Sequence, residues 1–324
     1  MKQERGYAKV TITPKGERAL LGGHPWVYDG EIVSIEGAYE NGALVDVVSG
    51  KGRYLGTGFL SETSRIRVRL ISRNANDRFD EAFWERRVRY AWEYRKTVMG
   101  EDTDCCRIIF GEADSFPGLT VDRFHDLLVT QTLSLGMELR KEMIFPLIYK
   151  VLTEDGQTIR GIYERNDVAI RAHEGLAENK GWFHLEGVPV PESPRTAIVE
   201  NGVEYAVDVE NGQKTGFFLD QKYNRQAVAR LARGKRVLDC FTHTGSFALN
   251  AAKGGRGPRD RRGRVRAGGG DGPGECPAQR PGGDHGLYGG QCVRPSACAG
   301  GEGGPSLRLH HPGPARLHQE PQDH

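Results

Sequence analysis

The sequence of 324 residues lacks any run of about 18 apolar residues, the minimum that a membrane-spanning helix needs. Its N-terminus, MKQERGYAKV, is polar and has no apolar segment of the kind found in signal peptides. Neither sign of charge dominates, since 45 Lys and Arg residues stand against 43 Asp and Glu residues, so composition alone indicates no general affinity for nucleic acid. These absences predict a soluble cytoplasmic protein without a membrane partner, in which any basic surface is local.

Regular cysteine spacing is also absent. The six cysteines do not form the pattern of a disulfide framework, and the adjacent Cys105 and Cys106 are expected to be buried rather than reactive. No C-x-x-C pair occurs, so we predict no metal. The weakly supported alternative is a zinc site drawn from the late cysteines and histidines, which are Cys276, Cys292, Cys298, His310, His311 and His318.

Large apolar residues are nearly absent after Gly255. Residues 256–324 contain no Lys, Phe, Ile, Met or Trp, but they hold 17 of the 44 glycines and 9 of the 16 prolines. Such a segment buries too little apolar surface to offset the entropy of ordering it, so we predict a disordered tail. The alternative interpretation of its stretch RGPRDRRGRVR is an arginine-rich arm that binds RNA.

Short β-branched and aromatic runs, separated by Gly, Pro and Asn, occupy residues 1–75 and predict a small β-barrel-like domain. In SRIRVRLIS, the residues Arg65, Arg67 and Arg69 alternate with apolar residues, so one strand face carries three guanidinium groups. Two interpretations stay open for this face: a solvated sheet surface, or a surface that contacts phosphate.

The next region, residues 76–190, reads as a compact α+β domain that ends at the prolines of EGVPVPESP. A helix over 79–99 is predicted because an apolar stripe recurs at helical spacing along it. We expect the aromatic residues of this stripe to belong to the core rather than to a base-stacking platform. The stripe consists of Phe83, Val88, Ala91 and Trp92.

After the prolines, a short buried strand (KRVLDCF), a loop of small residues (THTGSF) and a helix (ALNAAKGG) predict the first unit of a doubly wound α/β sheet. The loop residues Thr242, Thr244, Gly245 and Ser246 let a ligand approach the backbone, and Asp239 at the strand end can accept hydrogen bonds. Neither G-x-G-x-x-G nor G-x-x-x-x-G-K-[ST] is present, so a dinucleotide or triphosphate is disfavoured. The residues alone leave open a nucleotide-like ligand and a purely structural turn.

Two longer stretches carry a family resemblance. ENGQKTGFFLDQKYNR, followed by VLDCFTHTGSFALNAA, resembles the class I S-adenosylmethionine-dependent rRNA methyltransferases of the large-subunit cytosine-C5 type. GHPWVYDGEI resembles the PUA domain of that family, and GEADSFPGLTVDRF resembles its central linking domain. The resemblance implies a multi-domain α/β protein with a PUA-like RNA-binding domain at 1–75, a central α+β domain at 76–190, and the N-terminal part of a Rossmann-like methyltransferase domain at 195–255.

The same resemblance implies that S-adenosylmethionine is the cofactor and that rRNA is the partner. It assigns RNA binding to the PUA-like domain, which strengthens the phosphate interpretation of Arg65, Arg67 and Arg69. Four residues are expected to border the methionine end of the cofactor and three more to lie over the same pocket: Asp239, Phe241, Thr242 and Gly245, then Phe218, Asp220 and Gln221.

The chain departs from the family after Gly255. The family resemblance calls for an acidic residue for the ribose, a DPP-type loop beside the target base, and a cysteine whose thiolate attacks C6 of cytosine so that C5 accepts the methyl group. None of these motifs is legible in residues 256–324, so we assign no catalytic residue. Cys240 is not a substitute, because it lies beside the cofactor loop.

A shift of reading frame accounts for the departure. When codons for residues 311–324 (HPGPARLHQEPQDH) are read one nucleotide later, they permit ILDPPAFTKNRKT, which contains the missing motif. In the same frame residues 258–266 permit RVTAVDVSE, a strand with an acidic residue, and SLRLHHPG permits YDFIILD. We therefore predict that residues 256–324 are a wrong-frame translation and that the chain as written is inactive. The alternative function is an RNA-binding module without catalytic activity.

Overall fold

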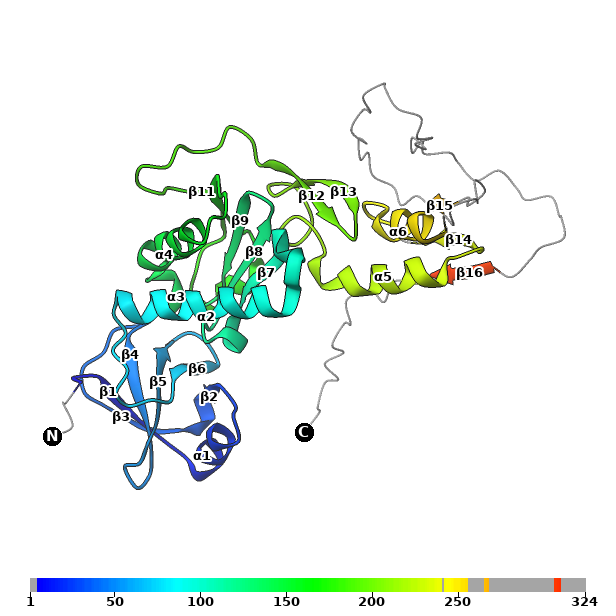
Figure 1. The fold of residues 1–324 in the computed structure, drawn as a ribbon. Helices are drawn as coiled ribbons and strands as arrows, with labels where there is room; N and C mark the ends of the chain where they lie inside the picture. The colour runs from blue at the N-terminus through cyan, green and yellow to red at the C-terminus, as the bar shows by residue number, and fades with distance from the viewer. Residues whose placement is uncertain (1–4, 241, 256–264, 268–305, 310–324) are drawn as a thin grey trace. The chain divides into compact units, whose positions relative to one another are not determined.

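The computed structural model describes residues 5–240, 242–255, 265–267 and 306–309, and all structural statements below concern these residues (Figure 1). They divide into two compact units. The first contains residues 1–199 and 204–219, and the second contains residues 200–203 and 220–324.

The N-terminal part of the first unit is a small β-domain built on one six-stranded sheet. The sheet has the order β2-β6-β5-β4-β1-β3. Strands β1 and β4 run parallel, with Val10 opposite Val47, whereas the other paired strands are antiparallel. The strands are β1 (Ala8–Ile12), β2 (Trp26–Tyr28), β3 (Ile32–Glu36), β4 (Leu44–Ser49), β5 (Tyr54–Leu60) and β6 (Ile66–Ser72).

The α-helix of this β-domain, α1 (Pro14–Leu21), packs against strands β2 and β5. Thr13 precedes it in an extended conformation, and its hydroxyl accepts a hydrogen bond from the Gly16 amide at 3.2 Å, so one of the free amides of the first turn is satisfied. Pro14 fits the first helical position because it has no amide hydrogen to leave unpaired. The inward-facing residues of helix and sheet form one apolar core, with Val10, Val27, Val45, Val47, Leu20 and Leu60 fully buried.

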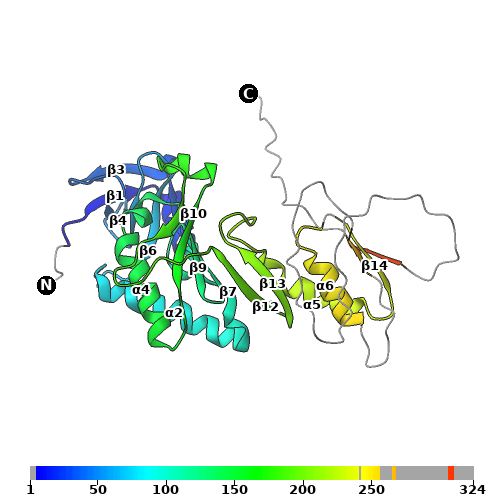
Figure 2. The ribbon, with the colours of Figure 1, turned by 90° about the horizontal axis from the view of Figure 1, so that it is seen from above.

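The central domain of the first unit is an α+β structure. Its five-stranded sheet has the order β11-β10-β9-β8-β7, and the helices α2 and α4 lie against each other and share one core with it (Figures 1 and 2). The elements are α2 (Glu81–Met99), β7 (Cys105–Phe110), β8 (Leu119–Phe124), β9 (Leu127–Thr132), α3 (Leu135–Glu138), α4 (Lys141–Glu154), β10 (Gly161–Asn166) and β11 (Asn179–Phe183).

Helix α2 confirms the prediction made for residues 79–99. It begins after Asp80, whose carboxylate accepts a hydrogen bond from the Phe83 amide at 3.0 Å. The predicted stripe is buried, so its aromatic side chains belong to the core, as expected. Trp84, one position outside that stripe, is fully buried as well. Cys105 and Cys106 are also buried, as predicted.

A hairpin of β12 (Arg195–Glu200) and β13 (Val203–Asp208) follows the central domain. Its two connecting residues, Asn201 and Gly202, have φ angles of 53° and 66°. Asn-Gly is the preferred pair where both residues of a two-residue hairpin loop need a positive φ, because glycine has no side-chain clash there and asparagine tolerates that conformation. The turn chemistry therefore determines the register of this hairpin.

The second unit contains the start of a parallel α/β sheet. Strand β14 (Arg236–Asp239) lies between β15 (Val265–Ala267) and β16 (Ser306–Leu309) and runs parallel to both. Helices α5 (Lys222–Leu231) and α6 (Ser246–Gly255) pack against each other (Figure 2). Gly254 permits this close approach, because a Cβ there would overlap the backbone of Ala229. The strand-loop-helix unit predicted from KRVLDCF to ALNAAKGG is confirmed.

Five short 3₁₀ turns complete the described elements: η1 (Asp29–Glu31), η2 (Gly100–Asp104), η3 (Gly111–Asp114), η4 (Ala169–Glu174) and η5 (Leu219–Gln221). Within residues 256–324, the structure describes only β15 and β16. These two segments are strands, whereas the sequence predicts a disordered tail over the whole range. The rest of the range lies outside the described residues.

Candidate functional site

Strand β14 ends in a buried carboxylate. Asp239 is the last residue of the strand and is only 1% exposed. Its Oδ2 accepts hydrogen bonds from the Thr242 hydroxyl at 3.1 Å and from the Ala248 amide at 3.2 Å. Its Oδ1 is buried and has no hydrogen-bond partner in the described part of the chain. A buried carboxylate oxygen without a donor is costly, so this atom suits a donor group on a ligand.

The loop between β14 and α6 turns at a glycine. Gly245 has φ +70°, a conformation that side chains rarely adopt, and its carbonyl accepts the first hydrogen bond of α6 from the Leu249 amide at 2.9 Å. Helix α6 begins at the next residue, so the free amides of its first turn lie at this loop. The structure thus brings together three of the predicted cofactor residues, Asp239, Thr242 and Gly245.

The other four predicted cofactor residues have different surroundings. Asp220 and Gln221 form a local pair ahead of α5, in which Gln221 donates to Asp220 at 3.1 Å and accepts from Asn224 at 2.9 Å. Phe218 belongs to the first unit, where the Lys214 ammonium lies 4.5 Å from the centroid of its ring. Phe241 lies outside the described residues.

A buried ion pair in the second unit links α5 to the last residue of β12. The Arg225 guanidinium on α5 binds both oxygens of the Glu200 carboxylate, at 2.6 and 2.8 Å, and both side chains are essentially inaccessible. Arg225 also lies over the ring of Phe247 in α6, at 5.9 Å. Asn250 ties α6 to the β12–β13 turn through Asn201, at 3.3 Å. Sequence reasoning missed these residues, because a pair 25 positions apart leaves no local signal.

The ENGQKTG segment, which carries part of the family resemblance, is held by the central domain within the first unit. The Thr215 hydroxyl donates to the buried carboxylate of Asp122 at 2.6 Å, and Arg107 binds the same carboxylate at 2.8 and 3.0 Å. Arg165 donates to the carbonyls of Val209 and Gly212, at 2.8 and 2.9 Å. These contacts hold the segment at both of its ends, although it has no regular secondary structure.

The three predicted RNA-binding arginines do not form one exposed basic face. Arg65 is exposed, and its side chain makes no ion pair or hydrogen bond to any described residue. Arg67 lies 3.5 Å from Asp29. Arg69 binds Glu112 at 3.2 Å and Glu174 at 2.9 Å, both from the central domain.

Arg69 therefore joins the β-domain to the central domain. Its guanidinium also lies 5.6 Å from the centroid of the Trp26 ring, and the Trp26 indole donates to the same Glu112 at 2.8 Å. The alternating pattern correctly predicted that Arg69 lies on the polar face of its strand. The pattern could not predict that two carboxylates of the central domain face this arginine. RNA binding by Arg65, Arg67 and Arg69 stays a prediction.

Metal and membrane features are absent from the part of the chain that the structure describes. No three His, Cys, Asp or Glu side chains there come close enough to hold a metal ion. No helix among those residues has the length and apolar character needed to span a bilayer. The late cysteines and histidines considered for zinc all lie outside the described residues.

Comparisons with known protein families match two separate parts of the chain. Residues 10–73 match the PUA-like domain family, and residues 181–261 match the family of S-adenosylmethionine-dependent methyltransferases. The chain thus contains a PUA-like domain and a segment of a methyltransferase whose cofactor is S-adenosylmethionine. Both assignments were predicted from the sequence and are confirmed.

Curated relatives narrow the class further. The chain is 41% identical over 240 residues to ribosomal RNA large subunit methyltransferase I of Aeromonas salmonicida (strain A449), covering 74% of this chain and 58% of that protein. It is 36% identical over 252 residues to the protein of the same name from Klebsiella pneumoniae (strain MGH 78578), covering 77% and 60%. The matched region therefore spans about 60% of the length of these relatives.

Two solved structures support the fold. A putative S-adenosylmethionine-dependent methyltransferase from Streptococcus mutans is 24% identical, with a TM-score of 0.61 over 76% of this chain and 61% of that one. A putative methyltransferase complexed with SAH is 25% identical, with a TM-score of 0.61 and coverage of 76% and 60%. The fold of the matched part of this chain is thus one that these two solved structures share.

Proposed function

We propose that this chain derives from an enzyme that transfers a methyl group from S-adenosylmethionine to a base of large-subunit rRNA, the base being cytosine and the acceptor atom C5. The observation that carries the proposal is the Asp239 Oδ1, which is buried at the carboxyl end of a parallel strand and has no hydrogen-bond partner among the described residues. The loop that follows contains Gly245 at φ +70°. In parallel α/β sheets, ligands bind at this edge. The names of the curated relatives support the substrate class.

The residues present fit the methionine end of the cofactor. Asp239 would accept hydrogen bonds from its amino group, and Thr242 and Ala248 hold the carboxylate in place through its other oxygen. Gly245 keeps the loop close to the strand without a side chain in the way. S-adenosylmethionine supplies an electrophilic methyl group on a positively charged sulfur, and an acidic residue close to that end also favours the cofactor electrostatically.

We further propose that residues 256–324 are translated one nucleotide out of frame. Three shifted readings in the same frame support this, including the ILDPPAFTKNRKT motif, as does the end of the methyltransferase match at residue 261. The nucleophilic cysteine would then be encoded farther along the corrected frame. The chain as written lacks it and is expected to be inactive.

The decisive experiment compares two proteins. The gene is resequenced across codons 250–260, and the frame-corrected enzyme and the present chain are incubated with large-subunit rRNA and methyl-labelled S-adenosylmethionine. We expect label in rRNA, mapped to cytosine C5, from the corrected enzyme alone. Turnover by the present chain, or an unbroken frame with codons that exclude the shifted peptides, would contradict the proposal.

A second candidate function is an RNA-binding module without catalysis. It is favoured by the completeness of the first unit, whose β-domain and central domain each have an extensive buried core. Salt-dependent binding of RNA by the present chain, without binding of S-adenosylmethionine, would support it, because phosphate contacts weaken as salt rises. Cofactor binding by this chain would favour a residual methyltransferase site.

A further inference from the structure

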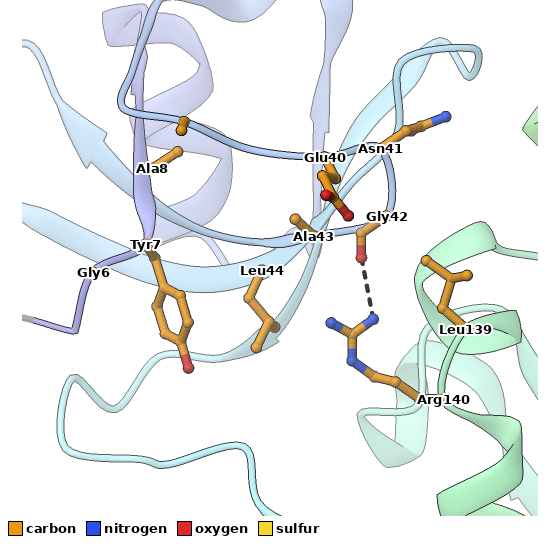
Figure 3. A pocket seen from close by; sticks show the side chains of 11 residues that line it. Gly6, Tyr7, Ala8, Glu40, Asn41, Gly42, Ala43, Leu44, Leu139 and Arg140 are labelled. Carbon is orange, nitrogen blue, oxygen red and sulfur yellow. Dashed lines mark hydrogen bonds between the residues drawn. The ribbon is translucent and has the colours of Figure 1, made fainter.

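A cavity opens inside the first unit, where the β-domain meets the central domain (Figure 3). It has a volume of about 520 Å³, which lies in the range of small-molecule sites. Strand β1 contributes Ala8, the segment before it contributes Tyr7, and the turn ahead of β4 contributes residues 40–43. Leu139 and Arg140, between α3 and α4, line the opposite side. Neither the methyltransferase loop nor the three arginines near β6 belong to it.

Arg140 is the most informative residue of this cavity. Its Nη1 donates to the carbonyl of Gly42 at 3.1 Å and to that of Gly136 at 2.7 Å, and its guanidinium lies 4.4 Å from the centroid of the Phe59 ring. No carboxylate among the described residues forms an ion pair with it, although Glu40 lines the same cavity. Burial lowers the pKa of Arg140. A half-buried cation without an anionic partner favours a ligand that brings negative charge.

Tyr7 faces the same space. Figure 3 shows the Tyr7 ring and the Arg140 guanidinium on opposite sides of the cavity, with Leu44 between them. Burial raises the pKa of Tyr7, and the positive charges of Arg5 and, less strongly, of Arg140 act in the opposite direction. The Arg5 guanidinium lies 5.7 Å from the centroid of the Tyr7 ring. An aromatic ring and a guanidinium plane are the two groups on which proteins stack unpaired nucleobases.

The turn at Gly42 lies close to side chains of the central domain. Gly42 has φ +83°, a conformation that favours glycine, and a Cβ at this position would lie 2.6 Å from Leu139 Cδ1. The Arg140 hydrogen bond to Gly42 fastens the same contact. Gly42 and Arg140 therefore fix one wall of the cavity.

We propose that this cavity binds one unpaired nucleotide of an RNA strand, with its base against Tyr7, Leu44 and Arg140 and its phosphate near the Arg140 guanidinium. The assignment rests on the RNA substrate of the proposed function, but it concerns a site separate from the cofactor loop. It explains why a cation is kept half-buried with backbone carbonyls as its only hydrogen-bond partners among the described residues.

The test uses the full chain and a fluorescein-labelled single-stranded RNA of mixed sequence, with binding measured by anisotropy. Tyr7→Leu and Arg140→Gln are each expected to weaken binding about 5- to 30-fold, the effect of losing one stacked base. Glutamine keeps a donor for the two carbonyls, so the fold is expected to persist, as circular dichroism will show. The matched controls are Tyr90→Leu and Arg53→Gln, which change exposed residues outside the cavity and should leave affinity within about twofold.

A second measurement needs no variant. RNA that carries 5-iodouridine is photocrosslinked to the unmodified chain, and mass spectrometry should find the adduct on Tyr7. Equal weakening by the control variants, or a crosslink confined to other residues, would overturn the assignment. If the chain binds no single-stranded RNA, the assignment also fails, whereas the methyltransferase proposal is judged separately by turnover of the frame-corrected enzyme.

Discussion

The two units of this chain differ in how their stability is built. In the first unit, many large side chains from sheets and helices fill two extensive cores. Among the residues that the structure describes, the apolar core of the second unit contains five buried residues, Val228, Ala232, Val237, Phe247 and Ala251. Burial of apolar area is the main source of folding free energy, so we expect this described part of the second unit to depend more strongly on the buried ion pair of Arg225 and Glu200. The comparison predicts that the first unit withstands the loss of one ion pair better than the second.

The largest expected effect comes from breaking that ion pair. Arg225→Ala leaves the Glu200 carboxylate buried without a partner, which costs about 3–5 kcal/mol. Hydrogen exchange of the full chain should then show loss of protection in residues 220–255, with residues 81–166 unchanged. The matched control is Arg89→Ala, which removes two exposed ion pairs of the first unit, to Glu85 and Glu154, and should cost less than about 1 kcal/mol.

An additional variant sharpens this result. Replacing both partners, with Glu200→Leu and Arg225→Met, removes the uncompensated charge, so it should restore most of the lost protection. If Arg225→Ala alone leaves hydrogen exchange in the second unit unchanged, the ion pair is not what holds that unit together.

The next effect concerns the cofactor site. In the frame-corrected enzyme, Asp239→Asn is expected to weaken S-adenosylmethionine binding about 10- to 100-fold, because a charged acceptor for the amino group is lost. Isothermal titration calorimetry measures this directly. Asp208→Asn, which alters a carboxylate in the first unit that binds Arg195 at 3.1 Å, should leave cofactor affinity unchanged. Equal affinity for Asp239→Asn and the unmodified enzyme would remove Asp239 from the site.

The smallest effect is a pH dependence confined to the first unit. Burial acts to raise the pKa of Asp126, but hydrogen bonds from Arg160 and Thr196 outweigh it and hold that pKa below the ordinary value of 3.8. A depressed carboxyl pKa stabilises the fold above pH 3.8, and this contribution disappears as the pH falls through the folded-state pKa. Asp126→Asn should therefore be less stable than the unmodified chain at neutral pH, and the difference in melting temperature should vanish in acid. A difference that persists at low pH would contradict this assignment.

Much of the organisation was predictable because its signals are local. The helical spacing of Phe83, Val88, Ala91 and Trp92 determined which face of α2 is buried. The run of small residues after Asp239 identified the strand-loop-helix unit, since such loops need residues that tolerate positive φ and close approach. The short β-branched and aromatic runs of residues 1–75, separated by Gly, Pro and Asn, predicted a β-domain. Each of these inferences required only neighbours within one element.

The sequence by itself determined the PUA-like and methyltransferase assignments, the strand-loop-helix unit at residues 236–255 and the change in composition after Gly255. Only the tertiary structure decided that Arg69 faces two carboxylates, that Arg225 binds Glu200, and that Tyr7 and Arg140 share a cavity. The physical reason is distance along the chain. Residues 105 positions apart, as Arg69 and Glu174 are, leave no periodic trace in composition, and only the folded backbone brings such charges together.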